Sequence, residues 1–291
     1  AATAWQSMIG KIIPPRHHGK FFGMQSATAN LFASVAALIA GIILLQIGSP
    51  VNFALCFFLA AVGMGISYIF LTLTRETEHA LNVSENDLRS IWKQAGTILR
   101  RDRNFSWFVA ARFFAQFAIA ATAFYTIYAT RTFGMNPETA GLMTSILLAT
   151  QVVANPIMGA LGDKLGHRTI LVLGTFAALL APLIAWASPG LEWFYLVYIL
   201  TGVGNVALWT ISIAMTLEFG GENERPVYVG LANTLLVPAS IAAPILGGWI
   251  ADAFGYQTMF MFSVICAAIT AIIFQFFMHN VHAPQNVARA K

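Results

Sequence analysis

Long apolar segments alternate with short polar ones along the whole chain. A helix needs about 20 apolar residues to cross the hydrocarbon core of a bilayer. Eight segments reach that length: residues 21–45, 51–73, 105–130, 138–160, 169–188, 192–217, 227–250 and 256–278. Transmembrane β-strands are runs of about ten residues with alternating polarity, and these segments are longer and more uniformly apolar. The pattern therefore predicts an all-α, polytopic bundle of transmembrane helices.

The composition supports this prediction. Of 291 residues, 58% are hydrophobic and only 10% are charged, whereas a soluble domain carries about 25% charged residues. A water-soluble globule is excluded, and we expect an integral, multi-pass membrane protein. Both cysteines, Cys56 and Cys266, lie in apolar segments, where a thiol behaves as a small hydrophobic side chain and implies no disulfide framework.

The basic residues indicate how the helices are oriented. Fourteen of the sixteen lysines and arginines lie in residues 11–20, 75–103, 164–168, 218–226 and 279–291, whereas the alternate connections contain only Arg131. Cytoplasmic loops carry an excess of positive charge, so we expect the first set in the cytoplasm. Since these bases are distributed over short loops and form no single patch, the isoelectric point near 9.2 gives no reason to expect nucleic acid as a partner.

The longest connection, residues 74–104, predicts a boundary between two halves. Within it, Leu88, Ile91, Trp92, Ala95, Ile98 and Leu99 recur at helical spacing, and Ser84 with Asp87 forms a candidate capping box. These features favour an amphipathic helix on the cytoplasmic face of the membrane. An ordinary solvated linker helix is the alternative.

A weak internal repeat relates the two ends of the chain. A shift of 207 residues places 19–61 on 226–268 without a gap, with eight identities, among them Gly23 with Gly230 and Gly48 with Gly255. Both windows follow a basic loop and hold two apolar segments joined by a short turn. Parallel repeats of this kind are common in transporters. The alignment predicts twelve helices in two halves of six, with about one hundred residues preceding Ala1.

One polar loop carries a family resemblance. Residues 159–168, GALGDKLGHR, lie between the second and third apolar segments of a six-helix half, and residues 12–23, IIPPRHHGKFFG, precede the segment 21–45. The first motif, Gly159-x-Leu161-Gly162-Asp163-Lys164-x-Gly166-x-Arg168, resembles the signature loop of the major facilitator superfamily, and the second resembles the stretch that joins helices four and five in bacterial members. His167 replaces the base more often found there.

The resemblance implies the fold and its division. Residues 1–73 would be the remainder of the N-terminal half, with the end of helix four and helices five and six. Residues 74–104 would be the cytoplasmic linker, residues 105–278 the complete C-terminal half with helices seven to twelve, and residues 279–291 a cytoplasmic tail. It also implies a multi-pass protein of the bacterial inner membrane that is a monomer when full length.

The signature loop is a candidate cytoplasmic gate. Gly162 and Gly166 allow a tight turn, and Asp163 can face the positive end of a neighbouring helix. In the family such loops hold the two halves together on the inner side. The twofold relation predicts that Asp163 meets the N-terminal turn of the helix that begins near Lys20. The gate motif comprises Gly159, Gly162, Asp163, Lys164, Gly166 and Arg168, and a plain polar turn is the alternative.

Polar residues within the segments are candidates for a substrate cavity. The side chain of Arg112 either reaches the membrane–water interface or faces a cavity. Gln116, one turn further along the same face, favours the second interpretation. Thr201, Asn205 and Trp209 follow one another at helical spacing in the segment 192–217, where helix–helix hydrogen bonding is the alternative. Further polar or kinked positions, each more typical of packing, are Asn30, Gln151, Asn155, Pro156, Asn233, Pro238 and Pro244.

No enzyme motif is found in the sequence. It contains no HExxH, no GxSxG, no Walker loop and no carboxylate pair within a segment, and His17 and His18 have no carboxylate or thiolate neighbours for a metal. We therefore expect no catalytic residue, metal or cofactor. A membrane-embedded enzyme or a receptor-like protein is the less favoured class.

These observations favour a secondary active transporter that moves a small molecule by alternating access. An efflux permease is the first interpretation, and a facilitated or ion-coupled uptake permease for a sugar or an organic anion is the alternative. A coupling proton is a further candidate partner beside the substrate and the lipid bilayer. Since the acidic residues lie in loops or at segment ends, any proton-carrying carboxylate is expected before Ala1.

Overall fold

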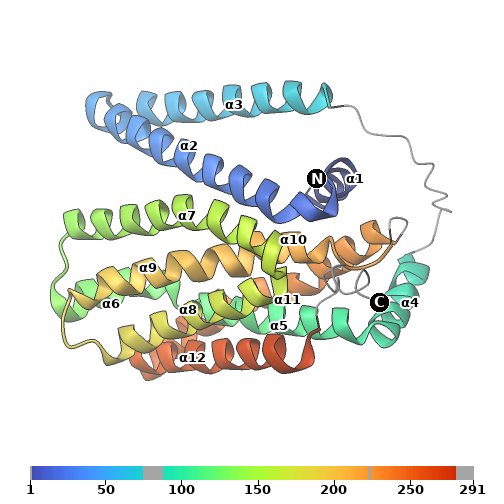
Figure 1. The fold of residues 1–291 in the computed structure, drawn as a ribbon. Helices are drawn as coiled ribbons and strands as arrows, with labels where there is room; N and C mark the ends of the chain where they lie inside the picture. Colours follow the sequence, from blue (N-terminus) through green and yellow to red (C-terminus); the bar gives the residue numbers. More distant parts are fainter. Residues whose placement is uncertain (1, 75–87, 222–223, 280–291) are drawn as a thin grey trace.

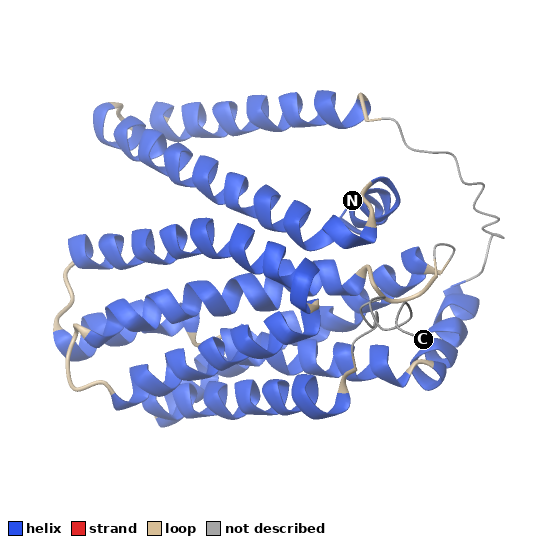
Figure 2. Ribbon diagram, in the orientation of Figure 1, coloured by secondary structure: helices blue, strands red, loops and turns tan. Residues whose placement is uncertain are grey.

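The structure is a computed structural model that describes residues 2–74, 88–221 and 224–279. All regular elements in these ranges are helical (Figures 1 and 2). The order is α1 (Ala2–Ile12), η1 (Pro15–His17), α2 (His18–Gln46), α3 (Val51–Thr72), α4 (Leu88–Arg101), α5 (Arg103–Ile119), α6 (Thr122–Phe133), α7 (Pro137–Leu165), α8 (His167–Ala187), α9 (Trp193–Asn205), η2 (Val206–Ile211), α10 (Ser212–Thr216), α11 (Arg225–Phe254), α12 (Tyr256–Ile272) and η3 (Ile273–Phe277).

The expected membrane spans are present as helices. In the described ranges seven helical stretches are long and apolar enough to cross a bilayer: Val51–Thr72, Arg103–Phe133, Glu138–Leu165, His167–Ala187, Trp193–Thr216, Arg225–Phe254 and Tyr256–Phe277. The remaining expected span, residues 21–45, lies within the 29-residue helix α2. The all-α, polytopic fold class is therefore confirmed.

Local sequence signals explain where several helices begin and end. Asp102 accepts a hydrogen bond from the backbone N–H of Phe105 at the start of α5 (2.9 Å). Asn136 accepts one from the N–H of Thr139 (2.7 Å) at the start of α7, where Pro137 occupies the first turn. Side-chain acceptors of this kind satisfy N–H groups that have no partner within the helix.

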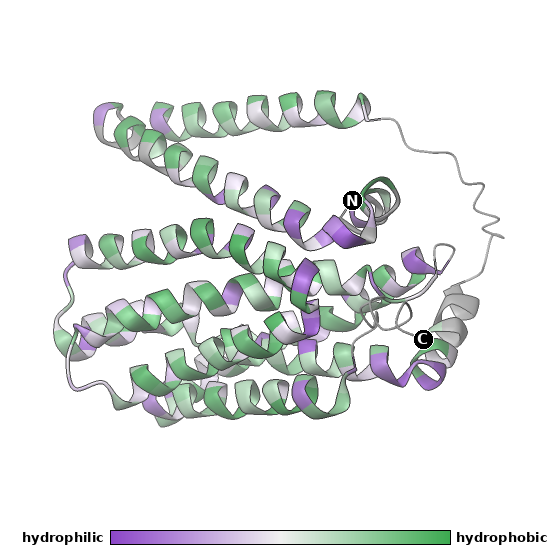
Figure 3. Ribbon diagram, in the orientation of Figure 1, coloured by the Kyte–Doolittle hydropathy of each residue, from purple (hydrophilic) through white to green (hydrophobic). Residues whose placement is uncertain are grey.

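The helices α5 to α12 form one bundle, and α1 to α3 lie along one side of it (Figure 1). Within this arrangement α2 lies along α7 and α1 contacts α11. Hydrophilic residues concentrate at the helix ends (Figure 3). We call the end that holds the start of α2, the α7–α8 turn and the start of α11 the basic end. The division into halves at residues 74–104 stays a prediction.

The buried core of the bundle near the basic end is aromatic. Phe105 lies 5.3 Å from Phe219 and 4.7 Å from Tyr228, measured between ring centroids, in edge-to-face contacts. The helix α4 packs onto this cluster through Ala95 and Ile98, which are buried. Two residues of the expected apolar face therefore contact the bundle. The candidate cap of this helix, Ser84 with Asp87, and the tail from residue 280 onwards lie outside the described residues.

Candidate functional site

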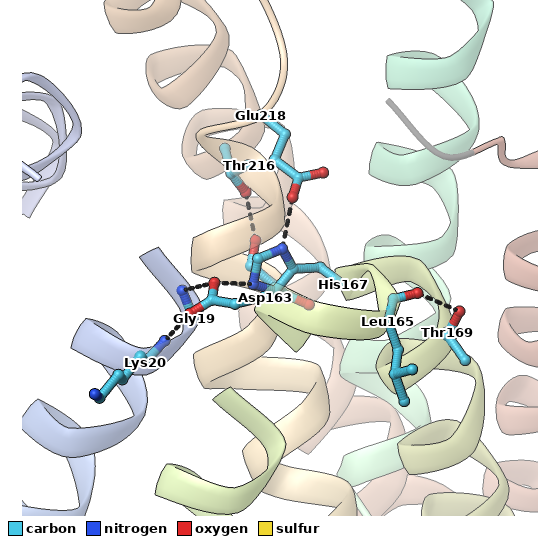
Figure 4. A network of polar contacts seen from close by, with 9 residues as sticks. Gly19, Lys20, Asp163, Leu165, His167, Thr169, Thr216 and Glu218 are labelled. Carbon is cyan, nitrogen blue, oxygen red and sulfur yellow. Dashed lines mark hydrogen bonds and ion pairs between the residues drawn. The ribbon is translucent and has the colours of Figure 1, made fainter. Parts of the chain in front are cut away.

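Asp163 joins the two parts of the molecule, helices α1 to α3 and the bundle of α5 to α12, at the basic end. Its Oδ1 accepts a hydrogen bond from the backbone N–H of Gly19 (2.8 Å), and its Oδ2 accepts one from the N–H of Lys20 (2.7 Å; Figure 4). Both donors belong to the first turn of α2, where N–H groups lack helical partners and the helix dipole favours a negative charge. The contact expected between Asp163 and the helix near Lys20 is confirmed.

Glycines bring the backbones of α2 and α7 together beside this carboxylate. A Cβ atom placed on Gly19 would lie 2.4 Å from the carbonyl oxygen of Gly159, and one on Gly23 would lie 2.3 Å from that of Asn155. Any side chain at these positions would collide with backbone. The spacing of Gly19 and Gly23 is the small-xxx-small pattern of close helix pairs in membranes.

His167 links the same carboxylate to a second one. Its Nδ1 lies 2.5 Å from Oε1 of Glu218, and its Nε2 lies 3.5 Å from Oδ1 of Asp163. Only 2% of the imidazole is exposed. Since a carboxylate only accepts, Nδ1 is the donor to Glu218, and the ring lies between the carboxyl groups of Glu218 and Asp163 (Figure 4). A Cβ on Gly162 would lie 2.7 Å from Cδ2 of His167, so this glycine makes room for the ring.

The remaining motif residues have separate places. Gly166 turns the chain between α7 and α8 with a φ of 92°, a conformation that favours glycine. Arg168 donates from Nε to the carbonyl oxygen of Phe274 (2.9 Å) and from Nη2 to that of Gln275, near the C-terminal end of the last helix. Lys164 is exposed. The sequence pattern did not predict that His167 contacts Glu218. Nor did it predict that Arg168 contacts these carbonyls.

His18 is buried beside this network. Its Nε2 donates to the carbonyl oxygen of Ile13 (2.8 Å), and its Nδ1 has no partner. Burial lowers the pKa of His18 below its ordinary value, and the positive charge of Arg225 lowers it further, whereas the Ile13 carbonyl and Asp163 act in the opposite direction. His18 therefore favours the neutral form. Its neighbour His17 is exposed.

A cavity of about 560 Å³ lies between the two parts of the molecule. Its lining residues come from α1, α2, α5, α7, α9, η2 and α10: Trp5, Phe22, Gln25, Ser26, Ala29, Asn30, Ile119, Gln151, Asn155, Asn205, Val206, Leu208, Trp209, Thr210 and Ile213. The wall combines aromatic rings with amide and hydroxyl groups, as small-molecule sites do. The cavity therefore has the composition expected of a ligand site.

The structure places only part of the predicted cavity set on this wall. Asn205 and Trp209 line the cavity, and 62% of Trp209 is exposed. Thr201 instead donates to the carbonyl oxygen of Val197 (2.7 Å) inside its own helix. Gln116 is not among the lining residues.

Arg112 does not line this cavity in the structure. Only 6% of it is exposed, its guanidinium lies 5.6 Å from the ring centroid of Phe108, and its Nη1 lies 3.5 Å from Oγ1 of Thr216. Arg112 is thus packed inside the bundle in this structure, and its place at a substrate cavity stays a prediction. Spacing alone does not determine the rotation of an apolar helix about its axis, so the face of α5 that carries Arg112 was not predictable.

A π-helical turn shapes the same wall. Residues Val206–Ile211 adopt this form directly after Asn205, and π-turns inside α-helices are frequent at functional sites. The extra residue in the turn changes the direction of side chains on either side of it. Four of its six residues, Val206, Leu208, Trp209 and Thr210, line the cavity.

Metal binding has no structural support in the described part of the chain. No group of three or more His, Cys, Asp or Glu side chains there could hold a metal ion. In the network of His167, Asp163 and Glu218, the imidazole donates a hydrogen bond to Glu218 and lies beside Asp163.

The matched family model covers the whole chain. The model described as the Major Facilitator Superfamily matches residues 1–129 and 108–291. With the helical fold and the contacts of the signature loop, this match shows that the chain belongs to the major facilitator superfamily. The recognised family is therefore confirmed, and an integral, multi-pass membrane protein follows from it and from the membrane-spanning helices.

Curated relatives match at low identity. The tetracycline resistance protein of class E from Escherichia coli is 26% identical over 52% of this chain and 37% of its own length. The alpha-ketoglutarate permease of Escherichia coli K12 is 27% identical over 76% of this chain and 52% of its own. The vacuolar basic amino acid transporter 2 of Saccharomyces cerevisiae is 25% identical over 47% and 29%. The chain thus spans about half or less of these relatives.

A solved structure supports the fold. The FucP transporter, crystallised in the outward conformation, superposes with a TM-score of 0.74 at 15% identity, covering 96% of this chain and 72% of FucP. At this identity the likeness concerns the fold alone.

Proposed function

We propose that the protein is a secondary active transporter that moves a small molecule by alternating access through the cavity between its two parts. The observation that carries the proposal is the position of this cavity. It opens between α2 on one part and α7, α9 and η2 on the other, so relative movement of the parts would change access to it. Binding near the middle of the membrane, between repeats, is typical of such transporters.

The signature loop supplies the gate in this proposal. Asp163 and the close contact of Gly19 with Gly159 hold the basic end shut in this conformation. By the distribution of lysines and arginines this end faces the cytoplasm. Breaking the carboxylate–helix contact would open the cytoplasmic side.

Export is the direction that we propose, from the bacterial inner membrane outward. The tetracycline resistance protein supports it, as do relatives named for multidrug resistance. Uptake is the second candidate, because the alpha-ketoglutarate permease matches over 76% of this chain. Flux measured in right-side-out and inside-out vesicles separates the two directions.

Counterflow in reconstituted vesicles tests the transport proposal. A carrier that alternates between two sides exchanges unlabelled compound inside for labelled compound outside, whereas a leak does not. We expect saturable counterflow for at least one compound from a broad panel of sugars, organic acids, amino acids and antibiotics, and its loss in Trp209→Ala. The absence of counterflow for every compound, or flux that does not saturate, would contradict the proposal.

A further inference from the structure

Five side-chain amides meet on the wall of the cavity, and no charged side chain of the described residues joins them there. They are Gln25, Asn30, Gln151, Asn155 and Asn205, from α2, α7 and α9. The hydroxyls of Ser26 and Thr210 lie on the same wall, 3.3 Å apart. A charged ligand would lose its hydration on this wall without meeting an opposite charge, at a high cost in free energy. The wall favours an uncharged ligand.

The amides are only partly satisfied by one another. Asn30 donates from Nδ2 to Oε1 of Gln151 (3.2 Å), which joins α2 to α7. Asn155 donates from Nδ2 to the backbone carbonyl oxygen of Gln151 (2.8 Å), and this acceptor fixes which way the amide points. The Oδ1 of Asn155 is left buried and without a partner in the described structure. An unsatisfied buried acceptor is costly, so a donor that reaches it gains binding energy.

Aromatic rings flank this polar wall. Trp209 lines the cavity and is largely exposed although it lies within a membrane-spanning stretch, and Trp5 lines the same space. Indole rings offer an apolar face for a ligand ring, with their own N–H as a further donor. The ligand that complements both features carries hydroxyl or amide N–H groups on one side and an apolar or ring-shaped portion on the other.

From this arrangement we propose that the cavity selects uncharged, hydroxyl-rich compounds with an apolar ring, and that Asn155 is the specificity-determining acceptor, supported by Gln151. The proposal rests on the transport function proposed above and narrows its substrate class. Arg112, the basic side chain among the expected cavity residues, is buried away from this wall and adds no positive charge to it.

Matched probes test the ligand class. Phenyl β-D-glucoside is uncharged, phenyl β-D-glucuronide carries a carboxylate on the same frame, and the phenyl glycoside of glucosamine carries an ammonium group. With purified protein, we expect quenching of tryptophan fluorescence by the glucoside and at least tenfold weaker binding of both charged probes. Tighter binding of a charged probe, or no binding of the glucoside, would overturn the proposal.

Variants then test the residues. Asn155→Ser and Gln151→Leu should each weaken glucoside binding by about tenfold, a difference near 1.4 kcal/mol. Asn233→Leu is the matched control, because Asn233 also joins two helices through an amide pair, with Gln6 at 3.0 Å, but does not line the cavity. If Asn233→Leu weakens binding equally, or if both cavity variants keep wild-type affinity, the amides only hold helices together and the proposal fails.

Failure of this proposal can be told apart from failure of the transport function. Counterflow of a charged compound that is lost in Trp209→Ala would overturn the ligand class and leave the transport proposal intact. Binding of the glucoside without counterflow of any compound would support the ligand class and overturn transport. Gln151→Leu provides a second route if Asn155→Ser fails to fold, because Gln151 is less buried.

Discussion

The Oδ2 atom of Asp163 lies 2.7 Å from the backbone nitrogen of Lys20, although 143 positions separate these residues in the chain. The contact places a carboxylate at the positive end of a 29-residue helix. It also lies beside a close approach of the two backbones, at Gly19 and Gly159. The carboxylate of Asp163 and the close packing of the glycines thus stabilise the same end of the molecule. A separate substitution can remove each of these two contributions.

Substitution of Gly19 by alanine tests the packing. The new Cβ would lie 2.4 Å from the carbonyl oxygen of Gly159, so α2 and α7 must separate at a cost of about 1–3 kcal/mol, as for other overpacked contacts. We expect a lower melting temperature and a more open basic end. Gly141→Ala on α7 is the control, because a Cβ there meets no atom within 4 Å. Equal stability of the two variants would contradict the close contact.

Neutralisation of Asp163 tests the charge. Asp163→Asn keeps the size of the side chain but loses the favourable interaction with the start of α2, which is worth about 1 kcal/mol. Labelling of a single cysteine at Ser26, with Cys56 and Cys266 replaced by serine, should become about fivefold faster from the basic side. Asp252→Asn, an exposed acid near the other end of α11, should leave labelling unchanged. Unchanged labelling in Asp163→Asn would mean that the loop is only a polar turn and not a gate.

The burial of His18 predicts a pH effect. Because its folded-state pKa lies below the ordinary value of 6.5, the unfolded chain binds more protons, and stability rises with pH in this range. The stabilisation is complete above pH 6.5 and is lost as the pH falls towards the folded-state pKa. The groups that face His18 are the Ile13 carbonyl, Arg225, His167 and Asp163.

Paired variants isolate this titration. We expect His18→Gln to reduce the fall in melting temperature between pH 7.5 and pH 5.5, and His17→Gln, at the exposed neighbouring position, to leave it unchanged. His167→Gln serves as a second comparison, since His167 contacts Glu218 and Asp163 directly. An identical pH profile in wild type and His18→Gln would contradict the assignment.

Substitutions of Arg112 and Trp209 compare a residue packed in the interior with one that lines the cavity. Arg112 is buried without a carboxylate partner in the described residues, and replacing a buried charge by an apolar side chain is often neutral or stabilising. Arg112→Met should therefore retain substrate KM and thermal stability, whereas Trp209→Ala should raise KM at least tenfold without loss of stability. A large rise in KM for Arg112→Met would return Arg112 to the substrate site.

Much of this architecture could be predicted from the sequence. The length and polarity of the apolar segments predicted the helices, and the repeat between residues 19–61 and 226–268 led to the partner of Asp163. Gly166 was expected in a tight turn and has a positive φ. These predictions succeed because they depend on length, charge and local backbone conformation, which are properties of short segments.

The site was less predictable because it depends on helix rotation. A membrane helix can be apolar on every face, so the pattern does not show which face meets a neighbour. The sequence favours a cavity position for Arg112, whereas the structure buries this side chain in the bundle. Gln151 and Asn155, which by sequence are more typical of packing, line the cavity. Gln151 and Asn155 are one helical turn apart, and this spacing was the signal that could have placed both on one face of the helix.

The most direct test of the central claim is a distance measurement across the gate. Spin labels at the exposed positions Lys20 and Lys164 lie on α2 and at the end of α7, on opposite sides of the proposed opening. Pulsed electron paramagnetic resonance on the protein in lipid should show a short distance and a second, longer one, and the longer population should grow in Asp163→Asn. A single short distance, unchanged by Asp163→Asn, would contradict alternating access through this end of the molecule.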